Sequence, residues 1–179
     1  MNPPLPDTAV DTLLNLFAPA LGRDFPAYRN HVQRVLHFFR ALSPADTPLP
    51  DAVLIAAVFH DLGIWTDATF DYLRPSVVQA ELWLAAQNRA ALTPEVTAII
   101  LQHHKIRPYT AEFSENVERF RRADLVDLSL GLLPAGLPRD VVRDVRAAFP
   151  NAGFHWKLVV LTVRQVFRTP WRPLPMFRW

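Results

Sequence analysis

The adjacent residues His60 and Asp61 are the part of this sequence best suited to chemistry. They end the strongly apolar run of residues 53–59 and are followed directly by a second apolar stretch, residues 62–64. An imidazole and a carboxylate carried into an apolar interior need a strong partner, because burying an unpaired charge costs far more free energy than one side chain gains by packing. A divalent metal ion meets that need, so we expect His60 and Asp61 to bind one.

His31 lies on another segment whose pattern predicts a helix with an apolar inner face. Val35, Phe38, Phe39 and Leu42 follow it at helical spacing. We therefore expect the imidazole of His31 to point toward the core.

Asp124 occupies a comparable place on a third predicted helix. It stands between apolar residues such as Phe120 and Leu128, which predicts that Asp124 points inward while Asp127 takes a different direction. Imidazole nitrogen and carboxylate oxygen suit divalent manganese, iron, cobalt, nickel or zinc, and a chain without cysteine cannot build a thiolate site. The predicted metal ligands are two imidazoles and two carboxylates, those of His31, His60, Asp61 and Asp124.

Two further histidines, His103 and His104, end a fourth predicted helix. Val96, Ile99, Ile100 and His103 share one stripe of that helix, which aims His103 at the core, and His104 lies beside it. We expect at least one of the two to enter the site.

The order of these residues along the chain resembles that of the HD superfamily of metal-dependent phosphohydrolases. In this superfamily a histidine, a His-Asp pair and an aspartate each lie on a separate helix. The resemblance covers about residues 28–130, and the segments 28–31, 59–65 and 120–124 are similar to one bacterial branch of predicted HD phosphohydrolases. It implies an all-helical fold, a divalent metal ion and hydrolysis of a phosphoester in a small phosphorylated substrate, for example a nucleotide.

The resemblance also implies a catalytic role for His103, His104 or both, in binding a second metal or in contacting the substrate phosphate. Superfamily members with two metals usually carry another histidine between the His-Asp pair and this helix, and this chain has none from residue 62 to residue 102. That absence favours a single metal ion. Two alternatives stay open, a di-iron or mixed-valent oxygenase on the same scaffold and a catalytically degenerate ligand-binding protein.

A phosphohydrolase of this kind needs a carboxylate that orients or deprotonates water. Asp67, shortly after the His-Asp pair, is the first candidate, with Asp71 and Glu81 as alternatives. An anionic substrate also needs cations, and the chain offers them near the predicted ligands. The candidate phosphate-binding side chains are those of Lys105, Arg107 and Arg74.

The rest of the sequence predicts helices that could position these residues. Hydrophobic periodicity, with most of the 17 prolines at the breaks, predicts an all-α, single-domain helical bundle. The predicted helices cover residues 8–17, 27–42, 51–64, 76–87, 94–105, 112–130, 139–148 and 154–168. Residues 1–25 form an N-terminal helical extension, residues 26–150 the metal-binding core, and residues 151–179 a final helix and a basic, aromatic tail that pack on the core.

Composition sets outer limits on function. The chain has 179 residues, of which 50% are hydrophobic and 20% charged, so it fits one domain with a substantial core. Its start has no secretory signal and no run is long enough to span a membrane, so we expect a cytoplasmic protein. Residues 157–179 carry basic and aromatic but no acidic side chains, yet we expect them to pack on the bundle rather than bind nucleic acid. The sequence leaves the oligomeric state open.

Overall fold

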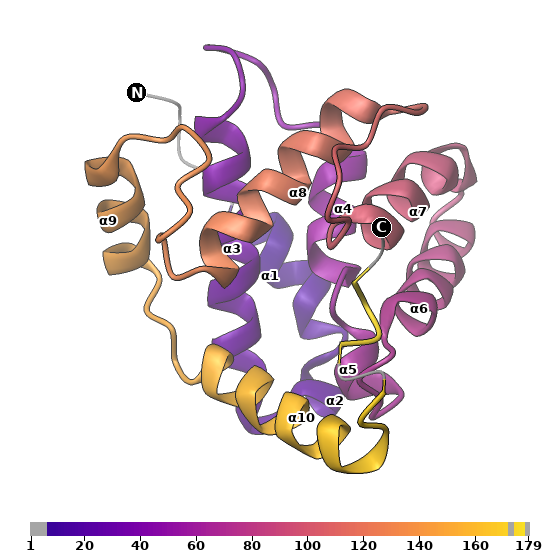
Figure 1. Cartoon of the computed structure of the whole chain (residues 1–179). Coiled ribbons are helices and arrows are strands. Elements are labelled where there is room, and N and C mark those ends of the chain that lie inside the picture. Colours follow the sequence, from indigo (N-terminus) through magenta and orange to yellow (C-terminus); the bar gives the residue numbers. More distant parts are fainter. Residues whose placement is uncertain (1–6, 172–173, 178–179) are drawn as a thin grey trace.

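The described part of the chain, residues 7–171 and 174–177 of a computed structural model, contains helices and no strand, which confirms the predicted fold class. Figure 1 shows their arrangement. Two short 3-10 turns, Gly22–Asp24 and Ala90–Leu92, link some of them. The α-helices are α1 (Asp7–Asn15), α2 (Ala18–Leu21), α3 (Phe25–Ala41), α4 (Asp51–Phe59), α5 (Gly63–Thr66), α6 (Leu73–Ala86), α7 (Thr93–Gln102), α8 (Ser114–Leu128), α9 (Arg139–Ala148) and α10 (Phe154–Arg168).

The predicted helix over residues 51–64 differs most from the structure, because it is interrupted at the His-Asp pair. From Leu62 onward the backbone closes tighter turns, with the amide of Leu62 donating to the carbonyl of Phe59 at 3.0 Å. The amide of Gly63 leaves the helical ladder and donates to the hydroxyl of Ser76 at 2.9 Å. A Cβ at Gly63 would lie 2.6 Å from the carbonyl oxygen of Tyr72, so glycine is needed where α5 meets the start of α6.

The centre of the molecule is a layer of packed helices. α3 packs along α8, while α4 packs along α7, which in turn packs along α6. Figure 1 shows α9 at one side of this layer and α10 lying across the end of α3. The helices that carry the predicted metal ligands are therefore central, and the peripheral helices cover them.

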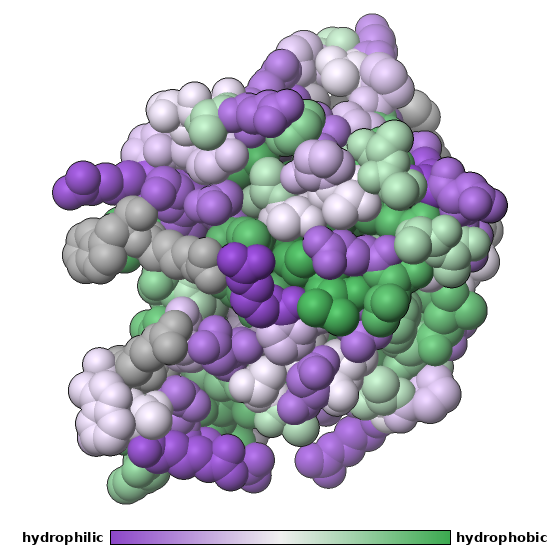
Figure 2. Space-filling model, turned by 90° about the vertical axis from the view of Figure 1, so that its right-hand side faces the viewer, coloured by the Kyte–Doolittle hydropathy of each residue, from purple (hydrophilic) through white to green (hydrophobic). Residues whose placement is uncertain are grey.

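Apolar side chains from these helices form one large core cluster and a smaller one beside it. The smaller cluster joins Ile64, Phe70, Tyr72 and Leu73 to Met176 of the tail. Figure 2 shows the face that carries α6 and α7, where hydrophobic residues gather in the middle and hydrophilic residues surround and cross them. The tail prediction for residues 172–173 and 178–179 lies outside the described residues.

Only part of α10 packs as the sequence predicted. Phe154 is buried in the main core, but Trp156 and Phe167 are 70% and 84% exposed. Among the described residues, no helix has both the length and the apolar character required to cross a membrane.

Candidate metal centre

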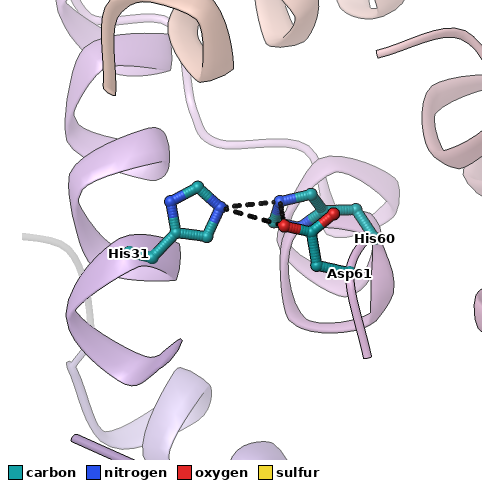
Figure 3. Close-up of side chains that lie close together, drawn as sticks. All are labelled: His31, His60 and Asp61. Atoms are coloured by element: carbon teal, nitrogen blue, oxygen red, sulfur yellow. Dashed lines mark hydrogen bonds and ion pairs between the residues drawn. The ribbon is translucent and has the colours of Figure 1, made fainter. Parts of the chain in front are cut away.

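The four predicted metal ligands converge in the middle of the bundle. His31 comes from α3, His60 and Asp61 from the turn after α4, and Asp124 from α8. Figure 3 shows the ring of His31 pointing at His60 and Asp61. The Nε2 atom of His31 lies 2.9 Å from Nε2 of His60 and 3.6 Å from both Oδ2 of Asp61 and Oδ1 of Asp124. All four side chains are buried.

The other ring nitrogen of each histidine fixes which atom faces the centre. Nδ1 of His60 donates to the carbonyl of Ala57 at 2.8 Å, and Nδ1 of His31 donates to the carboxylate of Asp127 at 2.7 Å. A neutral imidazole that donates through Nδ1 presents a lone pair at Nε2, the arrangement usual for histidine ligands of metals. The two Nε2 atoms therefore face each other at the centre, 2.9 Å apart.

This arrangement fits a cation. Two imidazole nitrogens and the carboxylate oxygens of Asp61 and Asp124 share one small buried volume, and the two carboxylates repel each other in an interior of low dielectric constant. A divalent ion among them would turn each repulsion into a bond, and these nitrogen and oxygen ligands suit first-row divalent metals. His31, His60 and Asp61 have ligand atoms close enough to share one ion.

Asp127 corrects the sequence analysis, because it too points inward. Its carboxylate is fully buried, accepts from Nδ1 of His31, and receives two hydrogen bonds from Arg34, from Nε at 2.5 Å and from Nη2 at 2.8 Å. Asp127 lies three residues after Asp124 on α8, so the two side chains share one side of the helix. The sequence did not single out Arg34, which stands three residues after His31 on α3. The equal spacing of His31 and Arg34 on one helix and of Asp124 and Asp127 on the other was the signal that could have indicated this second pair. Together Asp127 and Arg34 hold the ring of His31 in place.

The structure brings both His103 and His104 to the centre. The sequence had left open whether one of them or both would enter the site. Nδ1 of His103 donates to the carbonyl of Ile100 at 2.7 Å, and its Nε2 lies 3.5 Å from Oδ1 of Asp61. Nδ1 of His104 lies 3.6 Å from Oδ2 of Asp124, while its Nε2 shares a 2.8 Å hydrogen bond with the hydroxyl of Tyr72.

Three buried atoms on this side of the centre have no hydrogen-bond partner. They are Oδ1 of Asp61, Oδ2 of Asp124 and Nε2 of His103. Leaving such an atom unpaired costs about 1–3 kcal/mol. Asp61, His103 and His104 form a second group able to hold an ion, and it shares Asp61 with the first. The preference for a single ion, drawn from the sequence, stays a prediction beside this geometry.

Burial and neighbouring charges shift the pKa values of the groups in the centre in different directions. Burial lowers the pKa of His60 to about 3, although the Asp61 carboxylate acts to raise it, so His60 is neutral near pH 7. Burial raises the pKa of Asp61, but the imidazoles of His60 and His103 outweigh it and hold that pKa below its usual range. Burial raises the pKa of Asp124 to about 6; the carboxylates of Asp61 and Asp127 add to this rise, while nearby imidazoles oppose it.

A cavity of about 230 Å³ adjoins the second group of ligands. His103, His104 and Asp124 form part of its wall, together with the cations Lys105 and Arg121. Arg121 is held there by Glu118, which accepts from its Nε at 2.7 Å and from its Nη2 at 2.9 Å. Phe177 of the tail closes one side, with its ring stacked on His104 at 5.3 Å between centroids.

The remaining predicted site residues lie elsewhere. Asp67, the candidate base, is exposed and accepts from the hydroxyl of Thr66 at 2.7 Å. α5 begins at Gly63 and carries the following segment to the surface, so Asp67 does not line the cavity. Four others are likewise exposed and outside its lining. They are Asp71, Arg74, Glu81 and Arg107.

Comparisons of this chain with protein-family models, with curated proteins and with solved structures find no match. The resemblance to the HD superfamily therefore rests on the residues named above.

Proposed function

We propose that this protein is a metal-dependent phosphohydrolase of the HD type that cleaves a phosphoester in a small phosphorylated molecule, for example a nucleotide. One observation carries the proposal: imidazole nitrogens and carboxylate oxygens converge in the buried centre, and three of these atoms have no hydrogen-bond partner. In a cluster with only a structural role, these unpaired atoms would lower the stability of the fold and nothing would compensate for that loss.

The residues of the first group, His31, His60 and Asp61, would hold the ion, with Asp124 as the fourth ligand. A divalent ion there would polarise a phosphoryl oxygen and lower the pKa of bound water. Asp127 supports the group from behind by fixing the ring of His31.

The cavity supplies the groups that an anionic substrate needs. Lys105 offers a point charge, and Arg121, already oriented by Glu118, offers a planar fork of donors. The volume of about 230 Å³ suits a phosphate group and a small part of what bears it. We therefore assign phosphate binding to Lys105 and Arg121 rather than to the exposed Arg74 and Arg107.

We assign the transfer of a proton to His104 rather than to Asp67. Burial lowers the pKa of His104 well below its ordinary value, and the neighbouring His103 adds to that effect, so the ring is neutral near pH 7. Nε2 of His104 shares a hydrogen bond with the hydroxyl of Tyr72, and its Nδ1 lies 3.6 Å from Oδ2 of Asp124 at the wall of the cavity, so we assign proton transfer to Nδ1. In an arrangement with two ions, the same atom would be a metal ligand instead.

The second group of ligands favours one other candidate function. Asp61 presents Oδ2 to His31 and His60 and Oδ1 to His103, so its carboxylate could give one oxygen to each of two ions. A pair of iron ions held in this way would support a di-iron oxygenase on the same helices. The number and kind of metal ions separate the two candidates.

The test is metal content followed by turnover. The protein is purified without added metal or chelator, and bound metal is measured by mass spectrometry in the wild type, in Asp61→Asn, and in Asp67→Asn as an exposed-carboxylate control. Each protein is then loaded with manganese, iron, cobalt, nickel or zinc and assayed for phosphate release from phosphomonoesters and nucleotides.

We expect about one equivalent of metal and phosphate release in the wild type and the control, and loss of both in Asp61→Asn. Two equivalents of iron without phosphate release would favour the oxygenase, and metal without any turnover would leave a ligand-binding protein. No metal in the wild type after loading would refute both catalytic candidates.

A further inference from the structure

A second groove, separate from the cavity at the metal centre, lies between α9 and the loop that follows α8. Its volume is about 450 Å³. Three arginines of α9 line one side, Arg139, Arg143 and Arg146, and the loop contributes apolar side chains such as Leu130 and Leu132. No acidic residue is among the described residues that line it.

The spacing of the arginines explains why their charges gather. Arg139, Arg143 and Arg146 stand at i, i+4 and i+7, so they project from one face of α9. Like charges at this spacing repel one another on a helix. An anion in the groove would relieve that repulsion.

Little in the described chain neutralises these cations. Arg143 contacts Asp144 at 2.8 Å, but both side chains are about 70% exposed, and such a pair contributes little. Arg146 reaches toward the buried Asp127, with 3.9 Å between its Nη1 and Oδ1 of that carboxylate. Arg139 is exposed at the start of α9.

The wall opposite the arginines is fixed by the backbone. Leu130 and Gly131 both have positive φ, and the amide of Gly131 donates to the carbonyl of Val126 at 2.8 Å, which closes the end of α8. A Cβ at Gly131 would lie 2.6 Å from Cγ1 of Val142, so the loop lies directly on α9. The groove is thus held open by an ordered turn.

We propose that this groove is a binding site for a small polyanion, a phosphorylated molecule whose phosphate is held by Arg139 and Arg143. Arginine binds phosphate through two parallel hydrogen bonds, and the volume lies within the range of small-molecule sites. Leu130 and Leu132 provide an apolar surface for the rest of the ligand. The site does not depend on the function proposed for the metal centre.

Arg146 joins this groove to the metal centre. The same arginine lines the groove and faces Asp127, the residue that holds His31. Substituting Arg146 would disturb both places, so the test leaves it unchanged.

The test measures the binding of inorganic pyrophosphate to the metal-free full chain by titration calorimetry. Absence of metal prevents pyrophosphate from binding through an ion at the centre. The variants are Arg139→Ala/Arg143→Ala and, as a matched control for the loss of two positive charges, Arg164→Ala/Arg168→Ala on the exposed side of α10. Lys105→Ala reports binding in the cavity at the metal centre.

We expect saturable binding that is at least tenfold weaker in Arg139→Ala/Arg143→Ala and changed less than twofold in the α10 control. Thermal unfolding verifies that each variant is folded, and Arg139→Gln/Arg143→Gln replaces the alanine pair if that pair is destabilised. Absence of binding to the wild type would overturn the proposal. Equal weakening in the α10 control, or weakening confined to Lys105→Ala, would overturn it too.

Discussion

Replacing Asp124 with asparagine tests whether the centre is built for a cation at the expense of stability. Asp124 is 2% exposed, and burial together with nearby carboxylates raises its pKa from 3.8 to about 6. Its ionised form is thus less stable in the folded chain than in the unfolded chain. Since each pKa unit corresponds to about 1.4 kcal/mol, the ionised carboxylate costs about 3 kcal/mol at pH 7.5 as an upper bound.

Asparagine removes the charge and keeps the shape. In metal-free protein at pH 7.5, we therefore expect Asp124→Asn to raise the free energy of unfolding by about 1–3 kcal/mol, or by a few degrees in melting temperature. The gain depends on pH, because a carboxyl group with a raised folded-state pKa is destabilising above that pKa. The penalty falls as pH drops from 6 toward 3.8, so at pH 5 the gain should be about half as large.

The assay is urea denaturation of the wild type, Asp124→Asn and the exposed control Asp67→Asn, each with and without the metal found in the purified protein. Saturating metal should reverse the order, because it stabilises only the protein that binds it. If Asp124→Asn lowers stability both with and without metal, or if its effect is the same at pH 7.5 and pH 5, the carboxylate is an ordinary buried partner and the reasoning fails.

Three further predictions concern the support and the acid sensitivity of the centre. Asp127→Asn should weaken metal binding about 10–100-fold, because the carboxylate that orients the ring of His31 is lost. Competition with a fluorescent chelator measures the affinity. Asp144→Asn, an exposed control, should leave the affinity unchanged. Metal affinity should fall between pH 7.5 and pH 5.5, because Asp124, whose pKa is about 6, must lose its proton to bind a metal ion. The same chelator competition at a series of pH values measures this. An affinity that does not change with pH would argue against Asp124 as a ligand. Gly63→Ala should lower the free energy of unfolding by about 1–3 kcal/mol, because the new Cβ would lie 2.6 Å from the carbonyl oxygen of Tyr72; denaturant unfolding measures it, and a neutral result would show that the start of α6 can shift.

Much of the fold was accessible from the sequence, because helical periodicity is a local property. The predicted ranges 139–148 and 154–168 coincide with α9 and α10. The break after α4 was not accessible, because it depends on the hydroxyl of Ser76, thirteen residues away, capturing the amide of Gly63. Helical periodicity does not indicate a hydrogen-bond partner so far away in the sequence.

The convergence of His31, His60, Asp61 and Asp124 was predicted for a similar reason. A polar side chain within an apolar helical stripe must face inward, and several such side chains in one small domain have a single interior to share. Asp127 was misjudged because the apolar stripe of α8 accounts for only one inward carboxylate. Its partner Arg34 comes from another helix, and only that buried ion pair makes a second inward carboxylate tolerable.

Hydrophobic periodicity and side-chain chemistry belong to single residues and short segments, so the helical class and the candidate ligand types could be read from the amino-acid sequence. The tertiary structure decided which cations accompany the ligands. It placed Arg121 beside Lys105 at the cavity and left Arg74 and Arg107 exposed. The physical reason is that a long charged side chain goes where a partner from another helix holds it, and that partner is defined only once the helices have packed.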